Sequence, residues 1–496
     1  MGKVIIYQML PRLWGNIGGK NIKNGTLKDN GCGKFSSIDT ISLEYLRSLG
    51  VSHVWYTGII RHATAEDSAG CTPSSSDWVK GRAGSPYSIT DYYDVNPYLA
   101  DEPENRMEEF HKLVERTHAA GLKVIIDFVP NHVARDYGRF AAAHPAPTGM
   151  AALGESDDKS VHWKDSNDFF YYPGIPLALP IQNQTYMEMP AMASGNSYTS
   201  SPGVNDWYDT IKLNYCDTHT ETWEKMYDIV NFWAGQGVDG FRCDMVELVP
   251  PAFFKWLISR IKKDRPDLLF VAEVYQKTLY SKYIREIDFD LLYDKSGIYD
   301  TLRAIVEKNA KDSGVPVEDW QSAKRITWNW QSLGDLQPYM LNFLENHDEQ
   351  RFASDFFGCD ARNSYAALYT ALYLNNAPFM LYAGEEVGER GMDNEGFSGR
   401  DGRTSIFDWW APSSLTRLYK YIHGEKEALA PEEETMLDTY RKALKFAAED
   451  NAVSKGTFYD LCYCNYASDG FNPDRHFAFL RGRDLAHRLQ FLQERC

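Results

Sequence analysis

The chain has 496 residues, of which 43% are hydrophobic and 14% aromatic, and it carries a formal net charge of −17. This composition is typical of a globular protein with a sizeable core and excludes an intrinsically disordered chain. The acidic balance repels phosphate backbones, so we expect no nucleic-acid partner. No stretch approaches the roughly 20 apolar residues that cross a membrane, so we expect no membrane partner either.

The beginning of the chain and its cysteines bear on the compartment. The first apolar run, Val4–Tyr7, is shorter than the apolar region of a secretory signal and predicts a first strand instead. The eight cysteines are scattered, and Cys462 and Cys464 are too isolated to complete a metal site of four ligands. We therefore expect reduced thiols in a cytoplasmic protein. The oligomeric state stays open.

Short apolar runs alternate with amphipathic segments along most of the chain. Several runs are almost continuously apolar, as expected for strands buried on both faces. The segments between them, such as Met107–Ala120, space their apolar residues as a helix does. This alternation predicts an α/β fold, a (β/α)8 TIM barrel of parallel strands. The predicted strands are Val4–Met9, Val51–Tyr56, Leu122–Val129, Val238–Cys243, Leu268–Val274, Phe289–Tyr293, Met340–Leu344 and Pro378–Tyr382.

The catalytic barrel is expected to comprise residues 1–132 and 215–410, which is longer than a minimal barrel. Residues 133–214 are rich in Pro, Gly, Ser and Asn and show no clear periodicity. A structureless loop of that length is uncommon in a compact domain. We therefore predict a small lobe inserted after the third strand.

Residues 411–496 follow a different pattern. Leu415–Ile422 and Met436–Ala448 are predicted to be helical, and Thr457–Tyr466 and His476–Leu480 are strand-like. Arg481–Cys496 is polar, does not alternate as strands do, and is helical in composition. We interpret this region as a helical segment followed by the remnant of a β domain.

Four short segments follow predicted strands, and each places an acid at or just past the strand. A single acid there is more often a helix cap or a salt-bridge partner. Four in one barrel would converge on a single concave mouth, where barrel enzymes build their active sites and where charged groups perturb one another's pKa. The segments are Asp127–His132, Gly240–Asp244, Phe270–Tyr275 and Phe343–Asp348.

Two of these acids are suited to different roles. Arg242 and Asp244 are two residues apart on a strand, so they point to the same face, and the guanidinium favours an ionised Asp244 nucleophile. Glu273 follows Phe-Val-Ala, and apolar surroundings with neighbouring carboxylates would keep it protonated as a general acid. Paired carboxyl groups in these two states are what glycoside hydrolysis requires.

The four segments resemble, in order and approximate spacing, the signature regions of the α-amylase family of glycoside hydrolases, over roughly residues 3–410. The resemblance implies that Asp244 is the nucleophile, that Glu273 is the general acid/base, and that Asp348 stabilises the transition state. It further implies cleavage of α-glucosidic, chiefly α-1,4, bonds in malto-oligosaccharides or α-glucans by a retaining double displacement. No organic cofactor is implied.

The resemblance also assigns residues that bind substrate or support the nucleophile. For the histidines the simpler alternative is a hydrogen bond to backbone carbonyls, and for Arg351 it is a plain salt bridge. The residues are Tyr87, Asp127, His132, Arg242, His347 and Arg351.

Two departures from the family pattern limit the prediction. Glu247 and Leu248 stand where common amylases carry Lys and His on the leaving-group side. A transglycosylase or isomerase that uses a sugar acceptor therefore remains an alternative, and a catalytically silent barrel kept for binding is a second. Asn131 matches a usual calcium ligand, but Lys212 stands where the family has an aspartate. Calcium binds oxygen ligands, so we expect no metal there.

Overall fold

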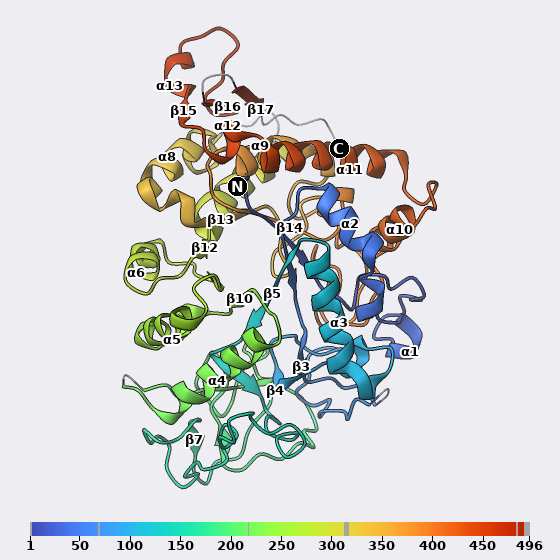
Figure 1. The fold of residues 1–496 in the computed structure, drawn as a ribbon, viewed down its shortest axis with the longest axis vertical. Coiled ribbons are helices and arrows are strands. Elements are labelled where there is room, and N and C mark those ends of the chain that lie inside the picture. The colour runs from blue at the N-terminus through green and yellow to red at the C-terminus, as the bar shows by residue number, and fades with distance from the viewer. Residues whose placement is uncertain (1, 68–69, 217, 312–316, 483–484, 491–496) are drawn as a thin grey trace.

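The computed structural model describes every residue except Met1, 68–69, 217, 312–316, 483–484 and 491–496. Its centre is a closed barrel of eight parallel strands (Figure 1), in which each strand pairs with the next barrel strand along the chain and β14 pairs with β1. The predicted TIM barrel is confirmed, and each predicted strand overlaps one of the observed strands. These are β1 (Ile5–Met9), β2 (His53–Tyr56), β5 (Lys123–Phe128), β10 (Gly240–Cys243), β11 (Leu269–Ala272), β12 (Leu291–Tyr293), β13 (Met340–Phe343) and β14 (Phe379–Tyr382).

The register of the barrel brings the ends of neighbouring strands to one rim. Arg242 on β10 lies opposite Asp127 on β5, and Cys243 lies opposite Ala272 on β11. The ladder continues one residue further, because the Glu273 amide donates to the Cys243 carbonyl at 3.1 Å. Residues that follow these strands therefore gather at the carboxyl end of the barrel, where (β/α)8 enzymes place their sites.

Amphipathic helices cover the outside of the barrel. In α3, Phe110, Leu113 and Val114 are buried against it, while Glu108 and Glu109 lie in the first turn, where acids suit the helix dipole. Among the described residues, no helix is long and apolar enough to cross a membrane. The helices are α1 (Leu27–Asn30), α2 (Thr40–Ser48), α3 (Arg106–Ala119), α4 (Glu221–Gly235), α5 (Pro251–Asp264), α6 (Tyr280–Arg285), α7 (Asp300–Lys311), α8 (Lys324–Leu333), α9 (Ser364–Tyr373), α10 (Ser413–Ile422), α11 (Pro431–Glu449), α12 (Asn451–Ser454) and α13 (Cys462–Asn465).

The chain between β5 and α4 forms a largely irregular lobe, at the bottom of Figure 1. The lobe has a small hydrophobic cluster of its own, in which Leu177, Leu179 and Tyr208 pack with Trp78 from the segment after β2. The insertion after the third barrel strand thus packs with the long connection after the second. Their strands are β3 (Ile60–His62), β4 (Ile89–Val95), β6 (His132–Ala134), β7 (Tyr171–Tyr172), β8 (Ala191–Met192) and β9 (Thr210–Lys212).

After the barrel, α10 and α11 are followed by an antiparallel sheet of β15 (Phe458–Asp460), β16 (His476–Arg481) and β17 (Leu485–Gln490), at the top of Figure 1. The prediction of a helical Arg481–Cys496 is wrong over β17, because this segment pairs with β16 over six residues. Backbone pairing with the strand directly before it overrides the composition of this segment. Residues 483–484 and 491–496 lie outside the described residues.

The strand prediction for Thr457–Tyr466 is only partly right. The strand ends at Asp460, and α13 begins at Cys462, whose amide donates to the Asp460 carboxylate at 2.7 Å. The side chain of Asp460 therefore competes with continued strand pairing. Among the described cysteines, Cys32, Cys71, Cys243 and Cys462 lie outside any disulfide.

Candidate active site

A pocket of about 260 Å³ lies at the carboxyl end of the barrel. Asp244, Glu273 and Asp348 line it, and they follow strands β10, β11 and β13. Tyr87, just before β4, and His132, at the start of β6, also line it. The structure therefore gathers the three predicted catalytic carboxyl groups and two predicted substrate-binding residues. The rest of the lining is Lys80, Ser85, Trp207, Asp209, Thr210, Met245, Tyr275, Ile406 and Phe407.

Arg242 links the two central acids from beneath the pocket. Its Nη1 lies 2.6 Å from Asp244 Oδ1 and its Nη2 lies 2.9 Å from Glu273 Oε1. The guanidinium is fully buried, with the rings of Trp55 and Tyr87 at 5.4 and 5.3 Å from it. One desolvated cation thus serves two carboxyl groups, an arrangement that fixes both in place.

The three pocket acids share that single positive charge, and each has a pKa above its usual range. Burial raises the pKa of Asp244, while the charge of Arg242 and hydrogen bonds from Arg242 and Glu273 lower it. Burial also raises the pKa of Glu273, Arg242 lowers it, and the Asp244 charge raises it. Desolvation within the pocket, followed by the charge of Glu273, raises the pKa of Asp348. Carboxyl groups this close cannot all ionise together, so the cluster retains a proton.

Glu273 has two further donors. The Met245 amide donates to its Oε2 at 2.8 Å, and the Tyr275 hydroxyl donates to its Oε1 at 2.6 Å. Met245 has φ 44° and ψ 48°, a left-handed conformation that is uncommon for a non-glycine residue. Such strained residues cluster at functional sites. Here the strain turns an amide of the β10 segment toward the acid of the β11 segment.

Asp127 lies directly behind the pocket and does not line it. Its Oδ2 accepts from Trp55 Nε1 at 3.0 Å, and its Oδ1 accepts from the Tyr87 hydroxyl at 3.3 Å. Arg242 Nη1 is 3.6 Å from Asp127 Oδ1. Burial raises the pKa of Asp127 to about 7, against the opposing charge of Arg242. Asp127 is therefore placed to orient Tyr87 and Arg242.

His347, the second member of the predicted sugar-binding pair, lies behind residues that line the pocket. Its ring is fully buried and is not part of the pocket lining. It stacks on Tyr87, with ring centroids 5.3 Å apart, and its Nε2 lies 2.5 Å from the Tyr87 hydroxyl and 3.1 Å from Asp348 Oδ2. Gln8 Nε2 is 2.8 Å from its Nδ1. In this structure His347 reaches the pocket only through Tyr87 and Asp348.

His132, by contrast, faces the pocket. Asn131 Nδ2 lies 3.1 Å from its Nδ1, and the Trp207 ring is 5.0 Å away. Burial lowers the pKa of His132 to about 3, so the ring is neutral near pH 7. Because Nδ1 accepts from an amide in this arrangement, Nε2 carries the hydrogen and can donate to a hydroxyl group.

Arg351 does not meet the prediction of substrate contact. It is completely buried, and its guanidinium pairs with Glu345 at 2.9 Å. Its other nitrogens donate to the Ala383 carbonyl and to the Thr404 hydroxyl, at 2.9 and 2.8 Å. The salt-bridge alternative is the one the structure supports, because all three nitrogens are occupied by protein groups. Arg351 ties the β13 and β14 connections together.

Several lining residues lie outside the set that the sequence predicts. Tyr275 could have been found, because it stands two residues after Glu273 and an extended chain places such residues on the same side. Trp207 and the ion pair of Lys80 with Asp209, at 3.2 Å, come from irregular segments. No local pattern marks such residues.

The residues expected around a structural calcium are joined by an amine instead. Lys212 Nζ donates to Asn131 Oδ1 and to the Leu248 carbonyl, the latter at 2.9 Å. The lysine is 3% exposed, and burial lowers its pKa to about 7. An amine in contact with both oxygens does not fit a calcium ion, which would need those oxygens as ligands.

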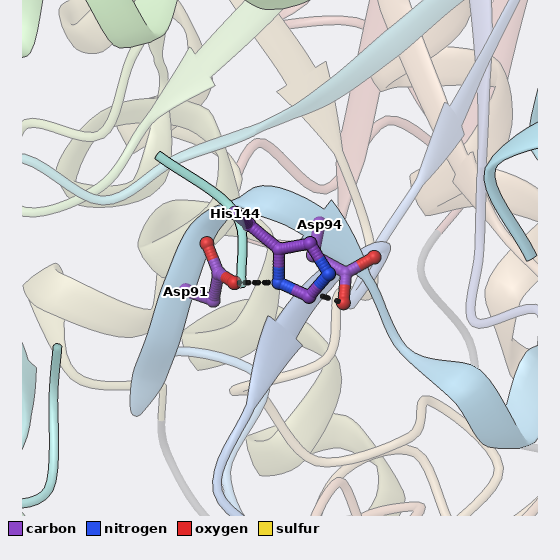
Figure 2. A group of neighbouring side chains, drawn as sticks. All are labelled: Asp91, Asp94 and His144. Carbon is purple, nitrogen blue, oxygen red and sulfur yellow. Dashed lines mark hydrogen bonds and ion pairs between the residues drawn. The ribbon is translucent and has the colours of Figure 1, made fainter. Parts of the chain in front are cut away.

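A second group with metal-binding side chains lies beside β4, where Asp91, Asp94 and His144 approach one another (Figure 2). His144 Nδ1 is 2.7 Å from Asp91 Oδ2. Asp94 is already paired with Arg61 and Arg106, at 2.9 and 2.8 Å. Two guanidinium groups on one carboxylate compete with any cation, so the cluster forms an ion-pair network and does not fit a metal.

These features define a TIM barrel with a carboxylate-lined pocket at the carboxyl ends of its strands. The family model "Alpha amylase, catalytic domain" matches residues 26–456, and the chain belongs to the α-amylase family. The expected family is thereby confirmed.

Individual relatives are distant. A cyclomaltodextrin glucanotransferase of Geobacillus stearothermophilus is 23% identical over 77% of this chain and 49% of its own. Neopullulanase 2 of Thermoactinomyces vulgaris is 24% identical over 70% and 48%. The chain thus spans about half the length of these two relatives. A maltogenic α-amylase of Thermotoga neapolitana has the same fold, with a TM-score of 0.60, 20% identity, and coverage of 99% of this chain and 86% of its own.

Proposed function

We propose that this protein cleaves α-glucosidic bonds in malto-oligosaccharides or α-glucans by a retaining double displacement. The observation that carries the proposal is the contact of Asp244 and Glu273 with the two ends of one buried guanidinium. Inverting enzymes keep their two carboxyl groups about 6.5–9.5 Å apart to admit a water, and retaining enzymes hold them closer. Contact of both carboxyl groups with the same guanidinium, at 2.6 and 2.9 Å, supports the closer arrangement.

In the proposed mechanism, Asp244 attacks the anomeric carbon while Glu273 gives its proton to the glycosidic oxygen. The resulting glycosyl-enzyme is then hydrolysed by a water whose proton passes to Glu273. Asp348, which is 43% exposed at the side chain, is free to bind sugar hydroxyls at the pocket mouth. His132 and Tyr87 contribute a donor and a ring to the same sugar.

The test is chromatography of the products from a panel of α-glucans, followed over time. We expect shorter malto-oligosaccharides to accumulate from α-1,4-linked substrates. Absence of cleavage across the panel by folded protein would contradict the proposal.

A second candidate is transfer of the glycosyl group to a sugar acceptor. Glu247, which departs from the family pattern, does not line the pocket. The lining residues near Glu273 include Met245, Tyr275 and Phe407. Apolar and aromatic groups exclude water and provide a surface for a sugar. In the same chromatograms, products longer than the substrate would indicate transfer, and shorter products alone would indicate hydrolysis.

We also propose that the Lys212 amine takes the family's calcium position between the barrel and the lobe, where it donates to oxygens that a calcium ion would need as ligands. We expect the melting temperature to be the same with a chelator and with added calcium. Lys212→Asp, which restores a carboxylate, should gain stability from calcium. Chelator-induced loss of wild-type stability would contradict the proposal.

We also propose that the protein is cytoplasmic. The proposal is supported by Cys32, Cys71, Cys243 and Cys462, which lie outside any disulfide. Cell fractionation with an antibody against the protein tests it. Recovery in the extracellular or periplasmic fraction would contradict it.

A further inference from the structure

The loops that follow β10 and β11 hold each other through an exchange of hydrogen bonds. The Met245 amide donates to the Glu273 carboxylate at 2.8 Å. In return, the Glu247 carboxylate accepts from the amides of Tyr275 and Gln276, each at 3.0 Å. Glu247, which replaces a residue of the family pattern, is therefore turned to the backbone of the neighbouring loop.

This exchange fixes the position of the Tyr275 side chain. Its hydroxyl donates to Glu273 Oε1 at 2.6 Å, the same oxygen that lies 2.9 Å from Arg242 Nη2. Arg242 is shared with Asp244, but the Tyr275 hydroxyl is directed to Glu273. Hydrogen bonds from a neutral donor to an ionised carboxylate are short and strong.

We propose that Tyr275 is a positioning residue that holds the Glu273 carboxyl and stabilises its ionised form, and that Glu247 sets the Tyr275 backbone for this purpose. The inference rests on the proposed function, in which Glu273 is the general acid/base. When Glu273 gives its proton to the glycosidic oxygen, the carboxylate that forms is the one the Tyr275 hydroxyl binds. When Glu273 regains a proton from water or an acceptor hydroxyl, that bond weakens again.

The tyrosine itself keeps its proton through the cycle. Burial, followed by the charges of Glu273 and Asp348, raises the pKa of Tyr275 far above its usual value. Removing the hydroxyl leaves the other titratable and charged neighbours of Glu273 in place. These are Arg242, Asp244, Asp348, His132 and Tyr293.

The decisive variant is Tyr275→Phe, assayed as kcat/KM against pH on a malto-oligosaccharide. The basic limb of this profile reports the loss of the acid proton, so we expect it to move up by about one pH unit. We also expect kcat to fall while KM changes little. Tyr56→Phe is the matched control, because it removes a buried hydroxyl that contacts Thr117 at 2.8 Å and not the pocket. Its basic limb should be unchanged.

Glu247→Gln tests the backbone part of the proposal. The amide keeps one acceptor oxygen for two N–H groups, so we expect a smaller shift of the basic limb in the same direction. An unchanged limb in Tyr275→Phe, or a loss confined to KM, would overturn the inference, since a tyrosine that only stacks on sugar gives the latter result.

A readout without turnover separates this inference from the proposed function. In protein labelled with ¹³C at glutamate carboxyl carbons, the Glu273 resonance is assigned by its loss in Glu273→Gln and titrated by NMR. We expect its midpoint to rise in Tyr275→Phe but not in Tyr56→Phe. If wild type cleaves no glucan, the proposed function fails while the titration still decides the role of Tyr275. If glucan is cleaved and the midpoints agree, only the inference fails.

Discussion

The floor and the wall of the pocket are built in different ways. The floor consists of Asp244 and Glu273, which follow barrel strands and contact Arg242. Asp348, which also follows a barrel strand, lies at the pocket mouth. The wall includes Trp207 and Phe407, which lie in irregular segments. Strand register determines where the floor residues stand, whereas the wall depends on how long connections pack. In this barrel, strand register therefore places the carboxyl groups of the floor, and the connections place the aromatic groups of the wall.

The largest effect is expected at the floor, from Asp244→Asn. The amide keeps the shape but cannot attack the anomeric carbon, so kcat on α-glucans should fall by at least about 10⁴-fold. Initial rates of product formation measure it, and Asp267→Asn, at an exposed site, is the control with unchanged rate. A rate of glucan cleavage equal to that of wild type would show that the nucleophile is elsewhere.

A smaller loss is expected from Glu273→Gln, and it should depend on the substrate. Loss of general acid catalysis costs about 10²–10⁴-fold when the leaving group is a sugar hydroxyl. The phenolate of an activated aryl glycoside can leave without being protonated. The glycosylation step with such a substrate should therefore be much less affected. Comparing kcat/KM for the two substrates measures this, with Glu286→Gln, an exposed residue, as control. Equal losses on both substrates would argue against an acid role for Glu273.

The wall should respond mainly through binding. Trp207→Ala removes a ring that lines the pocket 5.0 Å from His132, and loss of one stacking surface worth about 1 kcal/mol corresponds to roughly a fivefold higher KM. kcat should change little. Trp163→Ala, an exposed residue of the same lobe, should leave both constants unchanged. A loss in kcat as large as that of the floor variants would break the distinction between floor and wall.

The same division explains what could be predicted from the sequence. Continuous apolar runs locate β10 and β11. Because these strands are neighbours in the barrel, Asp244 and Glu273, which follow them, are expected at the same rim. The depth of His347 could not be predicted, because it depends on what covers the side chain, here the Tyr87 ring. The position of Arg351 could not be predicted either, because its side chain turns back to pair with Glu345 of the preceding Phe343–Asp348 segment. β17 could not be predicted from its own polar, non-alternating sequence, because its strand structure comes from antiparallel pairing with β16, the strand directly before it.

Glu395, which supports the wall segment that carries Phe407, is expected to make the free energy of unfolding depend on pH. Its carboxyl is buried and accepts from the Ser405 amide at 2.6 Å, directly before the lining residues Ile406 and Phe407. Burial raises the pKa of Glu395 to about 9, and the Ser405 hydrogen bond opposes this only in part. The folded protein therefore keeps a proton that the unfolded chain loses above about pH 4.5, so stability falls as the pH rises from there toward 9.

Glu395→Gln should remove that slope, because the amide stays neutral at every pH. Relative to wild type, its free energy of unfolding should improve between pH 5 and pH 8, by about 1–3 kcal/mol. Denaturant unfolding at the two pH values measures the difference, and Glu425→Gln, at an exposed position, should follow wild type. If the free energy of unfolding changes equally with pH in Glu395→Gln and in wild type, the Glu395 carboxyl is ionised in the folded protein. Activity at neutral pH should be nearly unchanged, since Glu395 supports the segment that carries Phe407 and does not line the pocket.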